Sequence, residues 1–268
     1  KVLVIDIDPQ GNTTSGIGLS KNELGNTSYE VLVEDNIDPR TAIIPTGVEN
    51  LDIIPASVQL AGAEVVLIEI QGREKRLKKA LDKIKPDYDY IFIDCPPSTD
   101  NVVRAFLTAA DYIIAMQELK RYAMEGTEDF INKVLVPIVT NFEESHLQII
   151  GILPVLFSVR RSSQHANYQK TIDKYGESNI FKSIVKGSDR LEMYGENGIQ
   201  LNDYVDRRWW AIFADIFTEL EERIEYYEQH GDIEGFDYTP KYADSMANHI
   251  LPLGKEIKLN GIITNEQR

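Results

Sequence analysis

The sequence predicts an α/β fold, a doubly wound, mainly parallel sheet with helices on both faces, followed by a C-terminal helix and tail. Three observations support this. Short runs of β-branched and aromatic residues alternate with segments of helical period. Two of these runs end in aspartate before a turn that contains Pro or Gly. The chain has 268 residues, of which 43% are hydrophobic, so it is long and apolar enough to bury a full core.

Six apolar runs are predicted as buried strands. The two runs that end in aspartate, Val2–Ile5 and Tyr90–Asp94, leave no room for alternating polar positions, which is typical of parallel strands that are covered on both faces. Pro154 lacks an amide hydrogen and is expected to shorten the regular pairing of its strand. The predicted strands are Val2–Ile5, Leu51–Pro55, Tyr90–Asp94, Tyr112–Met116, Ile149–Phe157 and Ile180–Val185.

Helices are predicted between these strands and after the last of them. They cover about residues 27–33, 57–70, 73–84, 101–110, 124–141, 163–175 and 207–229. The basic face of helix 73–84 is interpreted as a solvated surface. Between the first strand and the first helix, the segment 11–20 is rich in Gly, Ser and Thr, and it is predicted as a loop that can present hydroxyls and amides to anions.

The C-terminal region differs in character. Segment 207–229 places its apolar residues on one stripe, with Asp215, Glu219 and other carboxylates expected elsewhere, so we predict a helix packed on the sheet. An acidic polar face disfavours a membrane-surface helix, which usually carries Lys or Arg there. We expect one α/β domain of residues 1–230 and a C-terminal extension of residues 231–268 without sustained periodicity, either docked or mobile.

Composition excludes several classes of protein. The single cysteine, Cys95, excludes a disulfide framework and any cluster that needs several thiolates from one chain, and it favours a reducing cytoplasm. No run approaches eighteen apolar residues and no signal peptide is apparent, so no membrane association is expected. The net charge of -15 disfavours a broadly basic nucleic-acid surface but is compatible with a local basic patch.

Candidate site residues follow two of the strands. Asp6 and Asp8 end the first strand, and Asp94 ends the strand Tyr90–Asp94. The carboxyl ends of parallel strands share one edge of a sheet, where ligands bind, so the three carboxylates are expected around one hard cation. A strand-end aspartate also serves to cap a helix or close a turn, which is the alternative interpretation.

Several sequence blocks in this order resemble the ParA and MinD family of deviant Walker ATPases, and within it the chromosome and plasmid partition ATPases. The resemblance covers Val2 to about Gln200. It is carried by VLVIDIDPQGNTTSGIGL, NLDIIPASVQLAGAE, YDYIFIDCPPS, YAMEGTEDF and IFKSIVKGSDRLEMYGENGI. A P-loop NTPase-like fold is therefore expected.

The resemblance implies an ATPase that uses ATP and Mg²⁺ and dimerises around two nucleotides. It implies nonspecific DNA binding, stimulation by a ParB-like centromere-binding protein, and a cytoplasmic, nucleoid-associated location. On matching positions, Asp8 is expected to orient or activate the attacking water, and Asp94 to act on the metal through a water. Asp6 is expected to support the magnesium shell and the nucleotide. Pro96 and Lys186 are expected nucleotide contacts.

Arginines are the expected DNA contacts. Arg161 and Arg190 match two arginines that serve DNA binding in partition ATPases, and Arg160 is an adjacent candidate that only spacing separates from Arg161. Doubled by a dimer, these guanidinium groups would form a phosphate-binding patch. Surface salt bridges to nearby carboxylates are the alternative.

One part of the family's pattern does not occur. No match to GxxxxGK[ST] is found in the 268 residues, whereas the family places this phosphate loop about 30 residues before the position of Lys1. We therefore expect this chain to lack the family's first strand, P-loop and first helix, with the loop encoded upstream. The alternative is a natural protein without the loop, a non-catalytic scaffold that binds DNA or protein.

Related ATPase-family proteins and other α/β classes fit less well. An electron-transfer relative with a shared iron-sulfur cluster would need two cysteines per chain. Septum-site regulators end in a basic amphipathic membrane helix, and the final residues KEIKLNGIITNEQR have too little apolar face for one. A dinucleotide oxidoreductase is disfavoured because no GxGxxG follows the first strand.

Overall fold

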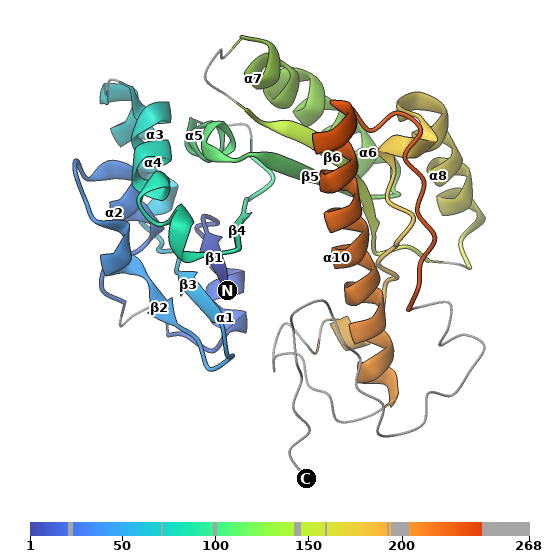
Figure 1. Cartoon of the computed structure of the whole chain (residues 1–268), viewed down its shortest axis with the longest axis horizontal. Helices are drawn as coiled ribbons and strands as arrows, with labels where there is room; N and C mark the ends of the chain where they lie inside the picture. The colour runs from blue at the N-terminus through green and yellow to red at the C-terminus, as the bar shows by residue number, and fades with distance from the viewer. Residues whose placement is uncertain are drawn as a thin grey trace. The chain divides into compact units, whose positions relative to one another are not determined.

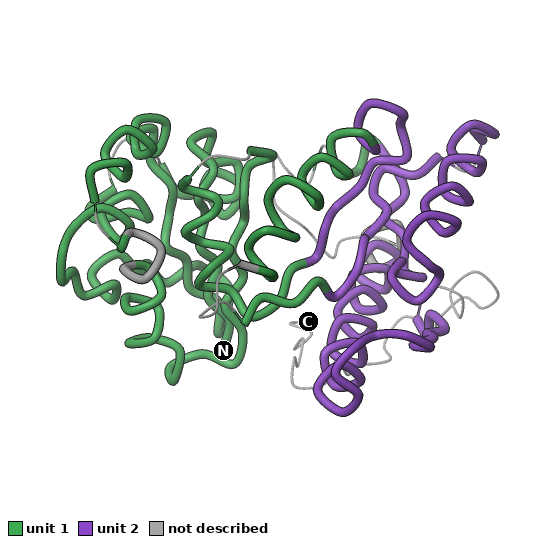
Figure 2. Tube along the Cα trace, turned by 90° about the horizontal axis from the view of Figure 1, so that it is seen from above, with its two compact units in different colours: residues 1–113, 125–149, 189–198 green, residues 114–124, 150–188, 199–268 purple. Residues whose placement is uncertain are grey.

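The computed structural model describes residues 1–20, 24–70, 72–98, 101–141, 146–158, 160–191, 193 and 204–242. The chain divides into two compact units, which are described separately (Figure 2). Unit 1 comprises Lys1–Ile113, Glu125–Ile149 and Asp189–Gly198, and unit 2 comprises Ile114–Met124, Ile150–Ser188 and Ile199–Arg268.

Unit 1 contains a four-stranded sheet in the order β2-β3-β1-β4 (Figure 1). Its strands are β1 (Val2–Asp6), β2 (Ile44–Pro45), β3 (Leu51–Ile54) and β4 (Tyr90–Asp94). Strand β1 is parallel to both β3 and β4, whereas the short β2 is antiparallel to β3. In this register Asp6 lies opposite Asp94, so the prediction that both aspartates end at one edge of a parallel sheet is confirmed.

Up to residue 141, the described part of the chain also contains seven α-helices. They are α1 (Asn12–Gly16), α2 (Ser28–Val33), α3 (Leu60–Glu69), α4 (Arg73–Asp82), α5 (Asn101–Ala109), α6 (Arg121–Phe130) and α7 (Val136–Asn141). Short 3₁₀ turns occupy η1 (Pro39–Ala42) and η2 (Lys85–Asp87), and a π-helical segment, η3 (Ile131–Leu135), joins α6 to α7. Helix α2 begins with a capping box formed by Thr27 and Glu30.

The main core of unit 1 lies between β1 and helices α3, α4 and α5. Leu3 and Ile5 of β1 are fully buried against apolar residues of these helices, among them Leu67, Leu77 and Phe106. Helix α4 packs on α5, and α3 packs on both α2 and α5. The buried face of β1 therefore fixes the strand whose end carries the candidate site.

The second sheet pairs β5 (Tyr112–Glu118) with β6 (Gln148–Val155). The amide of Gln148 donates to the carbonyl of Asp111, which aligns the starts of the two strands. Strand β6 ends at Val155, directly after Pro154, in agreement with the expected shortening. Both strands begin in unit 1 and continue in unit 2, which also holds α8 (Ser162–Tyr175), η4 (Glu177–Asn179) and α10 (Tyr204–His230).

The prediction of a regular strand at Ile180–Val185 is wrong. Among the described residues, isolated parallel bridges take its place, one at its first residue, Ile180 with Ile152, and one just after it, Lys186 with Phe157. The amides of Lys182 and Ser183 donate instead to the carboxylate of Glu219. A side chain of α10 thus takes the place of a neighbouring strand.

Helix α10 confirms the predicted C-terminal helix but not its predicted polar face. Trp209 and Leu220 of the apolar stripe are buried as expected. Asp215 and Glu219, expected away from the core, are only 1% and 0% exposed, and Arg223 is 0% exposed. The helix therefore buries charged side chains as well as its apolar stripe.

The described part of the C-terminal extension, residues 231–242, packs on α10. Phe236 meets the Tyr226 ring edge-on with a centroid distance of 5.5 Å, and the Tyr238 hydroxyl donates to Asp215 Oδ1 at 3.2 Å. The division into a domain of 1–230 and an extension of 231–268 stays a prediction. Within the described ranges, no helix has both the length and the apolar character needed to cross a membrane.

Candidate nucleotide site

The loop after β1 is closed by its own backbone and by Asp8. The Asp8 amide donates to Asp6 Oδ1 at 3.1 Å, and the Gln10 amide donates to Asp8 Oδ1 at 2.8 Å. The amide of Gly11 donates to the carbonyl of Asp8 at 2.8 Å. Gly11 has φ 58°, a left-handed conformation that glycine adopts without strain. The turn therefore holds Asp8 half-buried at the carboxyl edge of the sheet.

Asp6 is fully buried and organises this loop. Its Oδ2 accepts hydrogen bonds from the amide of Thr14 at 2.8 Å and from the Thr14 hydroxyl at 2.7 Å. Thr14 Oγ1 also accepts from the amide of Ala56, which follows β3. The turn-closing interpretation of a strand-end aspartate therefore holds for Asp6. Its additional role at magnesium and nucleotide stays a prediction.

Asp94, at the end of β4, lies opposite Asp6 of β1 and contacts α1. Its Oδ2 accepts a hydrogen bond of 2.7 Å from the Thr13 hydroxyl, and its carbonyl accepts from the amide of Ile7. Desolvation by the surrounding protein raises the pKa of Asp94, and repulsion from Asp6 and Asp8 acts in the same direction. The Thr13 hydrogen bond lowers the pKa in part. The site thus concentrates negative charge where β1 and β4 end, at the carboxyl edge of the sheet.

The three carboxylates do not form a ready-made metal shell. In the portion of the chain that is described, no group of three or more His, Cys, Asp or Glu side chains is arranged to hold a metal ion. The Asp6 carboxylate accepts a hydrogen bond from the amide of Thr14, and the Asp94 carboxylate accepts one from the hydroxyl of Thr13. Carboxylate and hydroxyl oxygens are nevertheless the donors that Mg²⁺ accepts, usually one or two from protein alongside phosphates and waters.

Pro96 follows β4 in a tight turn. The amide of Ser98 donates to the Pro96 carbonyl at 2.8 Å, and Pro96 is half-buried. This turn lies two residues after Asp94. The expected contact of Pro96 with nucleotide stays a prediction.

The expected DNA and adenine contacts lie in other parts of the chain. Arg160 and Arg161 are exposed side by side at the start of α8, where Arg161 is the N-cap residue. Lys186 is exposed at the bridge with Phe157. These three residues belong to unit 2, whereas Arg190 is half-buried and belongs to unit 1. Their roles stay predictions.

Two threonines of the site were not named from the sequence. Thr13 contacts Asp94 and Thr14 contacts Asp6, and both come from the polar segment 11–20 that was predicted to present hydroxyls. The composition of that segment indicated its chemistry. It did not show which hydroxyl would meet which carboxylate, because that depends on the αL turn at Gly11.

Parallel strands that end in carboxylates beside a hydroxyl-rich loop are characteristic of the nucleoside-triphosphatase class of α/β proteins. A family model described as an AAA domain matches residues 1–149. The chain is 37% identical to the sporulation initiation inhibitor protein Soj of Bacillus subtilis over 82% of this chain and 86% of that protein. It is 34% identical to the chromosome partitioning protein ParA of Myxococcus xanthus over 71% of this chain and 66% of that protein.

A solved structure agrees with the α/β fold. Cobyrinic acid a,c-diamide synthase from Mycobacterium smegmatis with bound ADP and magnesium is 30% identical, with a TM-score of 0.64. The match covers 78% of this chain and 82% of that one. The chain belongs to the ParA and MinD family of ATPases, and the P-loop NTPase-like α/β fold expected from the sequence is confirmed.

Proposed function

We propose that this protein is an ATPase of DNA partition, acting in plasmid or chromosome segregation. The observation that carries the proposal is the Thr13–Asp94 pair beside Asp8, at the carboxyl edge of a parallel sheet, in a chain 37% identical to Soj. Phosphoryl transfer needs positioned groups and neutralised charge more than covalent chemistry. An edge with fixed carboxylates and a hydroxyl supplies such groups.

The residues of this edge have distinct roles in the proposal. Asp94 and Thr13 would hold Mg²⁺, with Asp6 fixing the loop that carries Thr13 and Thr14. Bound magnesium neutralises the charge that develops on the phosphates. Asp8 orients the attacking water, since its carboxylate is half-buried and the turn fixes its backbone. Pro96 and Lys186 contact the nucleotide.

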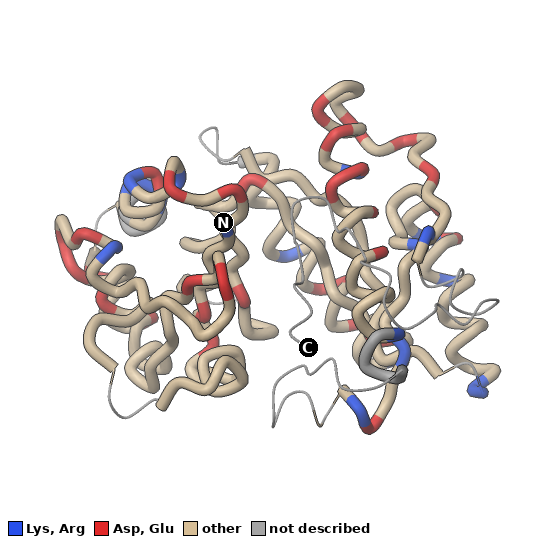
Figure 3. Tube along the Cα trace, turned by 60° about the horizontal axis from the view of Figure 1, so that its bottom comes forward, with Lys and Arg blue, Asp and Glu red and all other residues tan. Residues whose placement is uncertain are grey.

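Binding to DNA completes the proposed cycle. Two chains dimerise around ATP, and Arg160, Arg161 and Arg190 of both chains contact phosphates without sequence preference. Figure 3 shows acidic and basic positions interspersed along the chain, and the full sequence holds 43 acidic against 28 basic residues, a net charge of -15. DNA binding that depends on a few arginines should therefore be weak per monomer. A ParB-like centromere-bound protein stimulates hydrolysis, and the protein acts in the cytoplasm on the nucleoid.

The proposal is tested by magnesium-dependent ATP turnover of the intact gene product, alone, with nonspecific DNA, and with DNA plus the centromere-binding partner. We expect slow ATP turnover that rises when nonspecific DNA is added and rises again when the partner is added with it. Turnover that neither addition changes would contradict a partition ATPase. The Asp8→Ala variant should bind ATP and fail to hydrolyse it.

A second candidate is a non-catalytic scaffold that keeps the fold and binds DNA or protein. It is favoured by one observation, that GxxxxGK[ST] does not occur in these 268 residues. The scaffold predicts no saturable ATP binding by the intact gene product, together with DNA or partner binding that is indifferent to nucleotide. The ATPase hypothesis predicts saturable ATP binding, and DNA or partner binding that depends on nucleotide.

A further inference from the structure

Three charged side chains are buried along one side of α10. Asp215, Glu219 and Arg223 are spaced four residues apart, so they follow one another along the same face of the helix. Each is at most 1% exposed. A buried charge is costly unless it is paired and hydrogen-bonded. The hydrogen-bond partners of these three side chains therefore show which segments of the chain this face of α10 binds.

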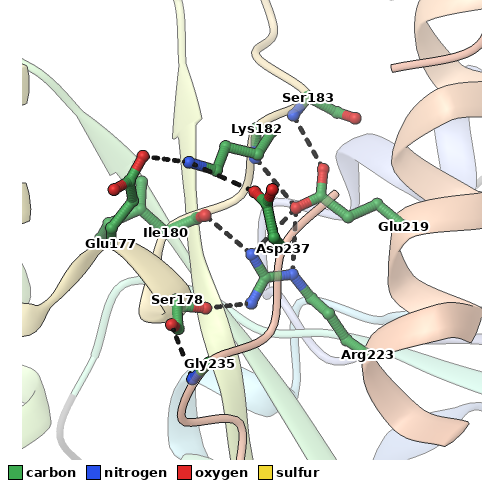
Figure 4. A network of polar contacts seen from close by, with 9 residues as sticks. All are labelled: Glu177, Ser178, Ile180, Lys182, Ser183, Glu219, Arg223, Gly235 and Asp237. Atoms are coloured by element: carbon green, nitrogen blue, oxygen red, sulfur yellow. Dashed lines mark hydrogen bonds and ion pairs between the residues drawn. The ribbon is translucent and has the colours of Figure 1, made fainter. Parts of the chain in front are cut away.

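Glu219 binds two consecutive backbone amides. Its Oε1 accepts from the amide of Lys182 at 2.9 Å, and its Oε2 accepts from the amide of Ser183 at 2.8 Å (Figure 4). Oε1 also accepts from Nε and Nη2 of Arg223 at 3.0 and 2.9 Å. One carboxylate therefore links the segment after η4 to the guanidinium of α10.

Arg223 binds backbone carbonyls around the same segment. Its Nη1 donates to Ser178 at 2.6 Å and to Ile150 at 3.2 Å, and its Nη2 donates to Ile180 at 2.7 Å. The guanidinium carbon lies 4.3 Å from the centre of the Phe181 ring and 4.7 Å from that of Phe236. Arg223 thus joins β6, the segment after η4 and the C-terminal extension.

The segment 180–187 is held on its other side by β6 and the residues after it. The amides of Phe181 and Val185 donate to Ile152 and Pro154, and the amide of Gly187 donates to Phe157. Close approach is possible because Gly151 has no side chain. A Cβ there would lie 3.0 Å from the Phe181 ring and 3.1 Å from the Asn179 carbonyl. The segment is therefore held both by the β6 backbone and by the Glu219–Arg223 pair, which also reaches β6 at Ile150.

We propose that Glu219 and Arg223 are positioning residues for Lys186. They fix the start of segment 180–187 in one register against β6, so that Lys186 emerges at a defined place at its end, beside Phe157. This inference rests on the proposed function, in which Lys186 contacts the nucleotide. The two residues act through the segment and do not touch the nucleotide.

A carboxylate is suited to this task for a physical reason. An apolar side chain at position 219 would tolerate a one-residue slip of the segment, which would move Lys186 away from its place beside Phe157. A carboxylate that accepts from two particular amides does not tolerate the slip, because the slip would leave buried polar groups unpaired. The pair therefore specifies register at a cost in desolvation.

The experiment compares two variants of the intact gene product. Glu219→Gln combined with Arg223→Met removes the clamp without leaving a buried charge. Asp215→Asn is the matched control, since Asp215 is equally buried on the same helix but accepts from Lys241 and Tyr242 of the extension. Readouts are melting temperature, hydrogen exchange of peptides covering 180–187, and the KM and kcat for ATP.

We expect the double variant to raise exchange in 180–187 and the KM for ATP about tenfold, with a smaller change in kcat. Asp215→Asn should lower the melting temperature while leaving hydrogen exchange in 180–187 and the KM for ATP unchanged. If the double variant does not fold, Glu219→Gln alone is compared with the control in the same way. Equal exchange and equal KM in the variant and the control would overturn the inference. Wild-type protein that binds no ATP would instead overturn the proposed function.

Discussion

The hydroxyl of Thr13 donates a 2.7 Å hydrogen bond to Oδ2 of Asp94, which is 81 residues further along the chain. The neighbouring Thr14 donates instead to Asp6, on the adjacent strand. Two consecutive threonines of α1 therefore bind the ends of two parallel strands. Thr13 is half-buried at the proposed metal position, and Thr14 is fully buried beneath it.

This difference predicts a large loss of stability for one threonine-to-valine substitution and a small loss for the other. Thr14→Val removes the donor to Asp6 and the acceptor of the Ala56 amide, so it should cost about 1–3 kcal/mol of unfolding free energy. Thr13→Val should cost about 0.5 kcal/mol or less because its bond is accessible to solvent. Urea unfolding measures the first effect, and magnesium-dependent ATP turnover should fall in Thr13→Val. Equal stability losses in the two variants would contradict the assignment.

Asp94 should weaken the fold at neutral pH. Because its pKa is raised in the folded protein, its ionised form is disfavoured by folding, and this cost is present above the folded pKa and absent below the unfolded one. Asp94→Asn should therefore raise the melting temperature at pH 7, by about 1–2 °C given that the group is partly accessible. The gain should vanish below about pH 4. Thermal unfolding of both proteins from pH 3.5 to 7 measures it, and a gain that grows toward low pH would refute the assignment.

Asp8 should be dispensable for folding and required for hydrolysis. Its carboxylate accepts one hydrogen bond, from the amide of Gln10 two residues away, so its removal leaves the strands intact. Asp8→Ala should change unfolding free energy by about 1 kcal/mol or less. The same variant should bind ATP with unchanged affinity while single-turnover hydrolysis falls by at least about 100-fold. Asp6→Ala, which removes a fully buried carboxylate, serves as the contrasting variant that should destabilise the protein.

Arg160 and Arg161 should contribute to DNA binding through charge alone. Each guanidinium that contacts a phosphate releases counterions, so Arg161→Ala should weaken binding to any sequence and reduce the slope of log K against log salt by about 1. Arg160→Ala shows whether the adjacent residue shares the contact. Fluorescence anisotropy between 50 and 200 mM salt, with ATP present, measures this. Arg40→Ala is the control, because Arg40 is engaged by Asp87 in unit 1.

Arg223 should be among the most destabilising positions to truncate. Arg223→Ala leaves Glu219 buried without its cationic partner, and it leaves the carbonyls of Ser178 and Ile180 without a donor. The expected cost is about 3–5 kcal/mol of unfolding free energy. Lys78→Ala removes a surface ion pair with Asp82 on α4 and should cost less than about 0.5 kcal/mol. Denaturant unfolding of both variants gives the comparison, and similar small losses would show that the pair is not important for stability.

Much of the fold followed from the sequence because it is encoded locally. Apolar runs such as Val2–Ile5 and Tyr90–Asp94 are long enough to be recognised as parallel strands, and the aspartates at their ends share one edge by the geometry of any parallel pair. The family followed from sequence blocks whose order is itself specific. Neither inference needed knowledge of contacts between distant residues.

The segment Ile180–Val185 and the polar side of α10 were mispredicted for one shared reason. An apolar run indicates burial but does not show whether the next partner is a strand or a side chain. A run of carboxylates on a helix is usually solvated, and only the tertiary structure places Lys182 and Ser183 against Glu219. Burial of these charges depends on backbone amides contributed from about 36 residues away, which no local pattern encodes.

The sequence by itself therefore determined the fold class, the strand ends that carry Asp6, Asp8 and Asp94, and the family. The tertiary structure decided which of these carboxylates serves the loop and which remains accessible, because that depends on where Thr13 and Thr14 point after the turn at Gly11. It also decided that α10 holds segment 180–187 with a buried ion pair. Hydrogen bonds between distant segments are short-ranged and directional, so they form only once packing has brought their groups together.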